Sequence, residues 1–353
     1  MTRRASIALL LALALAALVS GCGGGGRALP SQPGLPAIGA DPANAPVGAA
    51  AGVDVFGLAR HDIRFVMVTH GQASDPFWAV VQRGAQAAAR QLGVSVTYEA
   101  PDTYDVNRMR QLITAAIATK PAGLIVSLPD PVALAPAIRA AEKAGIPVIS
   151  INSGSDAFRR LGILLHVGQN EYQAGFAAGE RMASHHPRRV LCVIHEAGNL
   201  ALAERCRGFA AAISRGGGRS SVLTVNLQQP QAAEKRIAAT LAARRYDGLL
   251  TLGGASIAGP TLDALRTDHL LGRLPYATFG IGPQVLHAVE RSEIAFAADQ
   301  QPYLQGYLPI VLLTQYHLYG VLPDRGKVVD TGPVFITKQN AHHVLALLGE
   351  GVR

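Results

Sequence analysis

The sequence predicts an α/β protein built from two doubly wound parallel sheets. From residue 63 onward, strand-like apolar runs alternate with helical patterns, which is typical of parallel β/α folds. The runs are continuously apolar, as expected when helices cover both faces of a sheet. The alternation starts again near residue 175 and yields more strands than one domain of average size holds. With 353 residues, 49% hydrophobic and 16% charged, the chain can bury two cores.

The N-terminus has the pattern of a secretory signal over residues 1–21. A basic start with Arg3 and Arg4 precedes an apolar run over 6–19, which is shorter than the roughly 20 residues of a membrane span. The ending Val19-Ser-Gly-Cys22 resembles a bacterial lipobox, and we expect Cys22 to carry lipid. The alternative is an ordinary signal peptide with a chance cysteine. Residues 22–60 are rich in Gly, Ala and Pro, which predicts a tether.

The first half of the folded part follows a regular alternation. A helix is expected over 76–92 because Asp75 can cap it and Pro76 suits its first position. Loops are expected at 102–105 and 216–219. Strands are expected at 63–69, 94–98, 123–127 and 147–151, and further helices at 106–119 and 132–144.

The same alternation then repeats in the second half. Strands are expected at 189–194, 221–226, 248–252, 276–280, 294–298 and 334–337, and helices at 175–184, 201–214, 231–244 and 303–320.

Two cysteines fall within this second half. Cys192 lies in an expected strand and Cys206 in the following helix, each about 10 Å from the turn that joins them. Because the two cysteines lie at the same distance along the paired strand and helix, a disulfide can form between them in an oxidising compartment. A packed helix and strand, however, hold Cα atoms near the ~7 Å limit for a bridge. The sequence is therefore compatible with two buried free thiols and with a disulfide between them.

Composition and motifs exclude several functions. The formal charge is +8 and the pI about 9.7, but no Lys/Arg cluster with interleaved aromatics marks a nucleic-acid surface, so we expect no nucleic-acid partner. No Walker A, G-x-S-x-G, H-E-x-x-H or C-x-x-C motif is present, so we expect no enzyme activity and no cofactor. His185 and His186 sit at an expected helix end, where positive charge suits the dipole, and we expect no metal.

Five motifs, in this order and spacing, carry a family resemblance. They are Asp75-Pro-Phe-Trp78, Gly145-Ile-Pro-Val-Ile149, Val167-Gly-Gln-Asn-Glu171 with Gly175, Arg205-Cys-Arg-Gly-Phe209 and Asp299-Gln-Gln-Pro-Tyr-Leu-Gln-Gly306. Over residues 63–339 the chain resembles type I periplasmic substrate-binding proteins of the ribose and simple-sugar group. The resemblance implies two lobes and a three-segment hinge near His166, Gln300 and Thr331. The lobes would be 61–166 plus 301–330, and 167–300 plus 331–345.

The resemblance also implies a function. The chain would be a monomeric, lipid-anchored, extracytoplasmic solute-binding protein that presents a small neutral ligand, a sugar or polyol, to the permease of an ABC importer. Two alternatives stay open: a ligand-presenting sensor subunit for a membrane receptor, and a receptor for a less polar metabolite. A repressor-type regulator would need a helix-turn-helix where this chain has a signal and a tether.

The candidate ligand-binding residues follow from the same motifs. Phe77 and Trp78 match aromatics that stack on sugar rings, and Asp75 is a candidate acceptor for ligand hydroxyls as well as a helix cap. Asn152 and Ser153 stand where the family commonly has an Asp-Arg pair, and Gln300 keeps its polar identity at the second crossover.

Other family positions have lost their polar side chains. Ala203, Gly253 and Gly280 stand where the resemblance implies Arg, Asn and Asp, whereas Arg205 matches a neighbouring, structural arginine. Replacement polar groups near strand ends are His195, which we select as a ligand-binding residue, with His70, Glu196 and Asn199. Asn199 has the alternative role of a helix cap.

Overall fold

The structure is a computed structural model that describes residues 60–71, 75–323 and 326–353. The expected signal, the tether and Cys22 lie outside the described residues. None of the helices in the described ranges is both long enough and apolar enough to cross a membrane.

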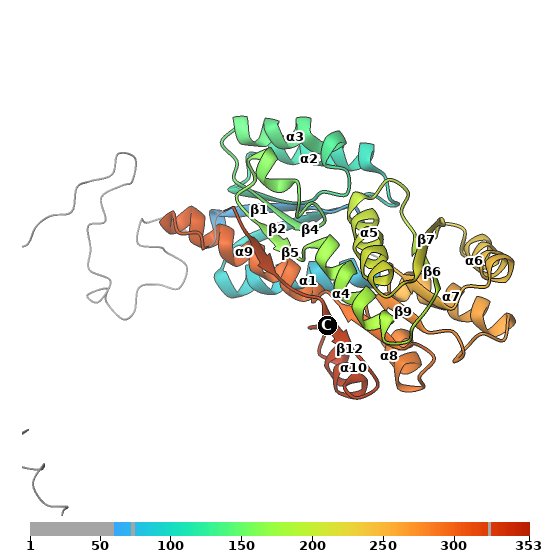
Figure 1. Cartoon of the computed structure of the whole chain (residues 1–353). Coiled ribbons are helices and arrows are strands. Elements are labelled where there is room, and N and C mark those ends of the chain that lie inside the picture. The colour runs from blue at the N-terminus through green and yellow to red at the C-terminus, as the bar shows by residue number, and fades with distance from the viewer. Residues whose placement is uncertain (1–59, 72–74, 324–325) are drawn as a thin grey trace, which may run out of the picture. The chain divides into compact units, whose positions relative to one another are not determined.

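The first lobe contains a six-stranded parallel sheet with the order β11-β5-β4-β3-β1-β2. Its core lies on both faces of the sheet, with helices α1 and α9 on one face and α2 and α3 on the other (Figure 1). The elements are β1 (Arg64–Val68), α1 (Pro76–Leu92), β2 (Ser95–Glu99), α2 (Val106–Ala118), β3 (Gly123–Ser127), α3 (Pro131–Lys143), β4 (Val148–Asn152), β5 (His166–Gly168), α9 (Pro302–Tyr319) and β11 (Val328–Asp330), with short 3-10 turns at Arg60–Asp62 and Phe158–Leu161.

The second lobe repeats this architecture with the strand order β12-β10-β9-β8-β6-β7. Helices α4 and α5 pack on one face of the sheet, and α6, α7, α8 and α10 pack on the other. The elements are α4 (Glu171–Ala183), β6 (Arg189–Ile194), α5 (Leu200–Arg215), β7 (Arg219–Thr224), α6 (Pro230–Arg244), β8 (Gly248–Thr251), α7 (Ala255–Thr267), β9 (Tyr276–Phe279), α8 (Pro283–Glu290), β10 (Phe296–Asp299), β12 (Val334–Ile336) and α10 (Ala341–Gly349).

The chain passes between the two sheets at three places. It leaves the first sheet after β5, returns to the first lobe between β10 and α9, and leaves it again between β11 and β12. These crossings lie beside Gly168, Gln300 and Thr331. The predicted two-sheet, doubly wound fold with a three-segment hinge is therefore confirmed.

Local capping signals set the start and end of α1. The Asp75 carboxylate accepts a hydrogen bond from the Phe77 backbone N–H at 2.9 Å, and Pro76 occupies the first turn. Gly93 ends the helix in a left-handed conformation with φ of 71°, which glycine adopts without steric cost. The predicted span 76–92 is confirmed.

Glycines let α4 and α5 pack with their backbones in contact. A Cβ on Gly175 would lie 2.0 Å from the Arg205 carbonyl oxygen, and a Cβ on Gly208 would lie 1.9 Å from that of Tyr172. Because no side chain separates the helices, Glu171 at the start of α4 reaches Arg205 on α5. This contact lies at the wall of the cavity described below, which Arg205 lines.

Several elements depart from the sequence prediction. Helices α7, α8 and α10 and the three-residue strands β5 and β11 were not expected, and β12 pairs antiparallel with β10. Helix α7 contains Gly259-Pro260, a pair that normally indicates a break. The helix nevertheless forms because Ile257, Leu262 and Leu265 pack into the core of the lobe.

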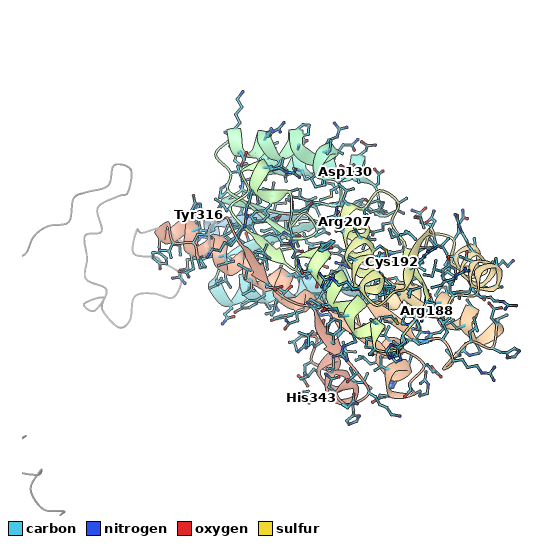
Figure 2. All side chains as sticks on the ribbon, in the orientation of Figure 1. Asp130, Arg188, Cys192, Arg207, Tyr316 and His343 are labelled. Carbon is cyan, nitrogen blue, oxygen red and sulfur yellow. A yellow bond between two sulfur atoms is a disulfide. The ribbon has the colours of Figure 1, made fainter. Side chains whose placement is uncertain are left out.

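Cys192 on β6 and Cys206 on α5 form a disulfide with a Cα–Cα distance of 5.9 Å (Cys192 is labelled in Figure 2). The alternative of two free thiols is therefore wrong. Helix α5 lies closer to the sheet at this point than the general helix–strand spacing suggested, and both residues belong to the same buried cluster.

Candidate functional site

A cavity of about 380 Å³ lies between the two lobes. Its wall is formed by residues that follow the carboxyl ends of strands in both sheets, where open parallel sheets place their ligands. The volume falls within the roughly 300–1,000 Å³ of small-molecule sites. Of the sequence-predicted site residues, the structure brings six together in this wall: Asp75, Phe77, Trp78, Asn152, His195 and Gln300.

Asp75 acts as a helix cap and also joins the two lobes. One carboxylate oxygen accepts from the Phe77 N–H, and the other accepts from the Ser256 hydroxyl of the second lobe at 2.5 Å. Leu200 N–H donates to the Pro129 carbonyl at 2.9 Å, which is a second link between the lobes. The described arrangement is therefore one in which the lobes meet around the cavity.

The aromatic wall is built at the start of α1. Trp78 is 5% exposed, and its ring stands edge-on to His70 at 4.8 Å and to Phe77 at 5.1 Å between centroids. A Cβ on Gly71 would lie 1.7 Å from Trp78 Nε1, so the indole occupies the space that any side chain at position 71 would need. Packing on both sides fixes this wall rigidly.

Three polar side chains meet across the cleft. His70 Nε2 of the first lobe lies 3.6 Å from the Glu196 carboxylate of the second, and Asn199 Nδ2 donates to the same carboxylate at 2.6 Å. Ser127 Oγ lies 2.8 Å from His70 Nδ1 and orients the ring. Asn199 Oδ1 also accepts from the Ala201 N–H, so Asn199 caps α5 and lines the cavity at once.

His195 owes its position to a glycine on the neighbouring strand end. A Cβ on Gly253 would lie 2.9 Å from both Nδ1 and Cε1 of the imidazole. The loss of a side chain at position 253 therefore makes room for His195. Its Nδ1 atom is buried and has no hydrogen-bond partner in the described ranges, as is also true of the Tyr104 hydroxyl. Buried polar groups normally have partners, and ligand hydroxyls could supply them.

A buried ionic network forms the base of the cavity. The Arg205 guanidinium pairs with Glu171, donates to Gln300 Oε1 at 2.7 Å and stacks on the Phe279 ring at 5.0 Å. Gln169 Nε2 donates to Glu171 at 3.2 Å. The network joins α4, α5 and the second crossover, so it holds the hinge side of the second lobe together.

The family positions at Asn152, Ser153, Ala203 and Arg205 have different fates in the structure. Ser153 is fully buried, its Oγ accepts from the Leu128 N–H at 3.2 Å, and it is not among the residues of the cavity wall. Asn152 lies in the wall, and its side-chain amide donates to Gln305 at 3.3 Å. Ala203 is exposed, whereas Arg205, expected to be only structural, lines the cavity.

Gly280 lacks a side chain because two loops touch there. A Cβ at this position would lie 2.9 Å from Gly254 Cα, and both glycines have positive φ, of 90° and 50°. Sequence reasoning missed Tyr104, Ser256 and Phe279 in the wall. Tyr104 belongs to an expected loop with no periodic pattern, so the sequence contained no signal for it.

Burial controls the protonation of the wall. It lowers the pKa of His70 to about 3 and that of His195 to about 4, and the positive charge of Arg205 contributes to both shifts. Burial, with a smaller contribution from the negative charge of Asp75, raises the pKa of Glu196 to about 7, against the lowering effects of the Asn199 hydrogen bond and the Arg205 charge. The histidines are therefore neutral, and Glu196 changes charge near neutral pH.

A smaller cavity of about 210 Å³ adjoins the first and shares Phe77, Gly280 and Gln300 with it. Arg83 and Arg353 contribute to its wall. Among the described residues, no group of three or more His, Cys, Asp or Glu side chains is arranged to hold a metal ion.

Comparison with known proteins gives consistent matches. A family profile described as a periplasmic binding protein domain matches residues 65–318. The chain is 25% identical over 304 residues to the xylose/arabinose-binding protein XylF of Sulfolobus acidocaldarius, covering 82% of this chain and 74% of that protein.

Solved structures agree with these matches. A carbohydrate transporter from Acidothermus cellulolyticus, in complex with myo-inositol, is 35% identical with a TM-score of 0.77, covering 82% of this chain and 99% of that one. AraP, an arabinose-binding protein from Geobacillus stearothermophilus, is 28% identical with a TM-score of 0.64, covering 80% of this chain and 99% of that one.

Proposed function

The chain belongs to the periplasmic binding protein family, and we propose that it binds a sugar or polyol between its lobes and delivers it to the permease of an ABC importer. The observation that carries this proposal is the cavity of about 380 Å³ whose wall comes from both lobes. A ligand that contacts both lobes favours the arrangement in which they meet. Proteins of this class close their two lobes around a ligand by a hinge motion, and the ligand stabilises the closed state.

The wall has the mixture of surfaces that a polyhydroxylated ring requires. Phe77 and Trp78 offer apolar faces for the ring carbons. Asp75, Asn152, His195 and Gln300 offer acceptors and donors for hydroxyl groups. The relatives point to the same ligand class, since one is named for xylose and arabinose and another was solved with myo-inositol.

We propose a binding role without catalysis. The relatives above are named as binding or transport proteins. Of the cavity's ionisable groups, Asp75 caps a helix, His70 and Glu196 meet across the lobes, and Arg205 pairs with Glu171. We further propose that the protein acts as a monomer. The boundaries between its two lobes fall at the crossovers beside Gly168, Gln300 and Thr331.

The ligand class is tested by a thermal-shift screen of the purified protein. The panel contains myo-inositol, D-xylose, L-arabinose, D-allose and a set of apolar metabolites of similar size. A ligand at a hundred times its Kd adds about 2.7 kcal/mol to stability, which moves the melting temperature by several degrees. A shift from an apolar compound and from no polyol would contradict the proposal.

We also propose that the mature chain begins at a lipid-modified Cys22, which would hold the receptor at the extracytoplasmic face of a membrane. Support comes from the sequence alone: the Val19-Ser-Gly-Cys22 ending and the glycines that follow it. Mass spectrometry of the N-terminal peptide from native membranes tests this. Diacylglycerol on Cys22 is expected, and an unmodified mature N-terminus at another residue would contradict it. A Cys22→Ser variant should lose membrane association.

A further inference from the structure

The charge of the cavity is opposite to that of the molecule. The whole chain is basic, with a formal charge of +8, yet the cavity wall carries two carboxylates and only one guanidinium among its described residues. Asp75 and Glu196 face the cavity from opposite lobes, and Glu171 lies directly behind the wall. Arg205 is the one lysine or arginine among the described residues of the wall.

Arg205 is already neutralised by a partner. Its guanidinium is 3% exposed and forms a buried ion pair with Glu171. A second N–H group donates to Gln300 at 2.7 Å, and the planar group stacks on Phe279. Because Glu171 offsets much of its charge, Arg205 lowers the pKa of Glu196 by less than the negative charge of Asp75 raises it.

The histidines do not balance these carboxylates either. His70 and His195 are buried, and each has a pKa lowered far below neutral pH, so both are uncharged. His70 Nε2 lies 3.6 Å from Glu196 and His195 Nε2 lies 4.0 Å from it, and both act as neutral dipoles.

The hydrogen bonds to the two carboxylates come from neutral donors. Phe77 N–H and Ser256 O–H donate to Asp75, and Asn199 Nδ2 donates to Glu196. Residues 72–74, which precede Asp75, are Gln, Ala and Ser and carry no charge. Part of the upward shift in the pKa of Glu196 comes from the negative charge of Asp75, so the two carboxylates repel one another.

We propose that the cleft takes a polyol that carries an amino group, and that Glu196 and Asp75 hold its ammonium from opposite lobes. This rests on the proposed function, because it names the ligand class of the same cavity. A cation between the carboxylates removes their repulsion and forms charge-assisted hydrogen bonds, which are roughly twice as strong as neutral ones. A carboxylate or phosphate on the ligand would add a third negative charge in a poorly solvated space.

Calorimetric titration at pH 7 with two matched sets of probes tests the proposal. One set is D-glucosamine, D-glucose and D-glucuronate; the other is an inosamine, myo-inositol and myo-inositol 1-phosphate. Within the set whose ring the cavity accepts, the aminated probe should bind about tenfold more tightly than the neutral one, a difference of ~1.4 kcal/mol. The anionic probe should bind more weakly than both.

Variants identify the source of the preference. Glu196→Gln keeps the shape of the side chain and its contact with Asn199 but removes the negative charge. In this variant the aminated probe should bind at most about threefold more tightly than the neutral probe. Asp263→Asn removes an exposed carboxylate on α7 of the same lobe and should leave the ratio unchanged. The melting temperature of each variant shows that it is folded.

The outcomes separate the inference from the proposed function. A neutral probe that binds as tightly as its aminated partner, or a preference that survives Glu196→Gln, overturns the ammonium site while the sugar-receptor function stands. Absence of binding by all six probes and by the thermal-shift panel overturns both.

Discussion

His70 Nε2 in the first lobe lies 3.6 Å from the Glu196 carboxylate in the second. Asn199 Nδ2 reaches both groups, at 2.6 Å to Glu196 and 3.5 Å to His70. The contact depends on the two lobes being together, because each residue follows a strand of a different sheet. His70, Glu196 and Asn199 thus join the lobes and also line the cavity.

Trp78 should report ligand binding directly. It is the single tryptophan of the chain and lies in the cavity wall against His70 and Phe77. We expect the emission of Trp78 to shift when a polyol binds, because the ligand replaces water at the ring. Fluorescence titration should give the same Kd as calorimetry. Unchanged emission during binding confirmed by calorimetry would place the ligand away from Trp78.

Gly253→Ala should weaken ligand binding without removing any polar side chain. The new Cβ would lie 2.9 Å from the His195 ring and displace it from the wall. Loss of one hydrogen bond to the ligand corresponds to about 1 kcal/mol, or roughly fivefold in Kd. Gly349→Ala is the matched control, because a Cβ there meets no atom within 4 Å. Equal affinities for the two variants would show that His195 does not contact the ligand.

Glu171→Gln should destabilise the fold strongly. It leaves the buried Arg205 charge without its partner, which typically costs about 3–5 kcal/mol. Glu204→Gln breaks an exposed pair with Arg207 on the same helix and should cost less than about 1 kcal/mol. Urea unfolding of both variants measures the difference. Similar free energies of unfolding would mean that the buried network contributes little.

Buried histidines should make the protein less stable as pH falls. The pKa values of His70 and His166 are lowered to about 3 and that of His195 to about 4, mainly by burial, whereas unfolded histidines titrate near 6.5. Their contribution is therefore full above pH 6.5 and is lost as pH falls towards the folded pKa values. Between pH 6.5 and pH 5, we expect each of these three histidines to lower the free energy of unfolding by about 2 kcal/mol.

The histidine effect is measured by chemical unfolding across this pH range. His166→Asn should make the decline shallower, since one proton-binding site of the unfolded chain is gone. His343→Asn replaces an exposed histidine on α10 and should leave the slope as in the wild type. A slope that does not differ between the two variants would contradict the assignment to His166.

Sequence patterns identified the elements that have clear local signals. The bounds of α1 follow from the Asp75 cap, Pro76 and Gly93, and β3 and β6 follow from short apolar runs. Helix α7 was missed because Gly259-Pro260 indicates a break that core packing overrides. Strands β5 and β11, at three residues each, are too short to show a period.

The candidate site was predictable only in part, since its chemistry depends on long-range contacts. Residues beside capping or aromatic motifs, such as Asp75 and Trp78, could be found from the sequence and do lie in the wall. Arg205 was expected to be structural; it does form a buried ion pair with Glu171, and that it also reaches the cavity wall depends on the close packing of α4 against α5. Ser153 was selected because, with Asn152, it stands where the family commonly has an Asp-Arg pair, but its hydroxyl accepts a hydrogen bond from the Leu128 backbone.

A crystal structure with the tightest-binding polyol of the panel tests the central claim most directly. The account predicts that the ligand lies in the cavity of about 380 Å³, with a ring face against Phe77 or Trp78 and polar atoms on Asp75 and Glu196. Ligand in the smaller cavity beside Arg83 and Arg353, or at the surface with the interlobe cavity empty, would contradict it.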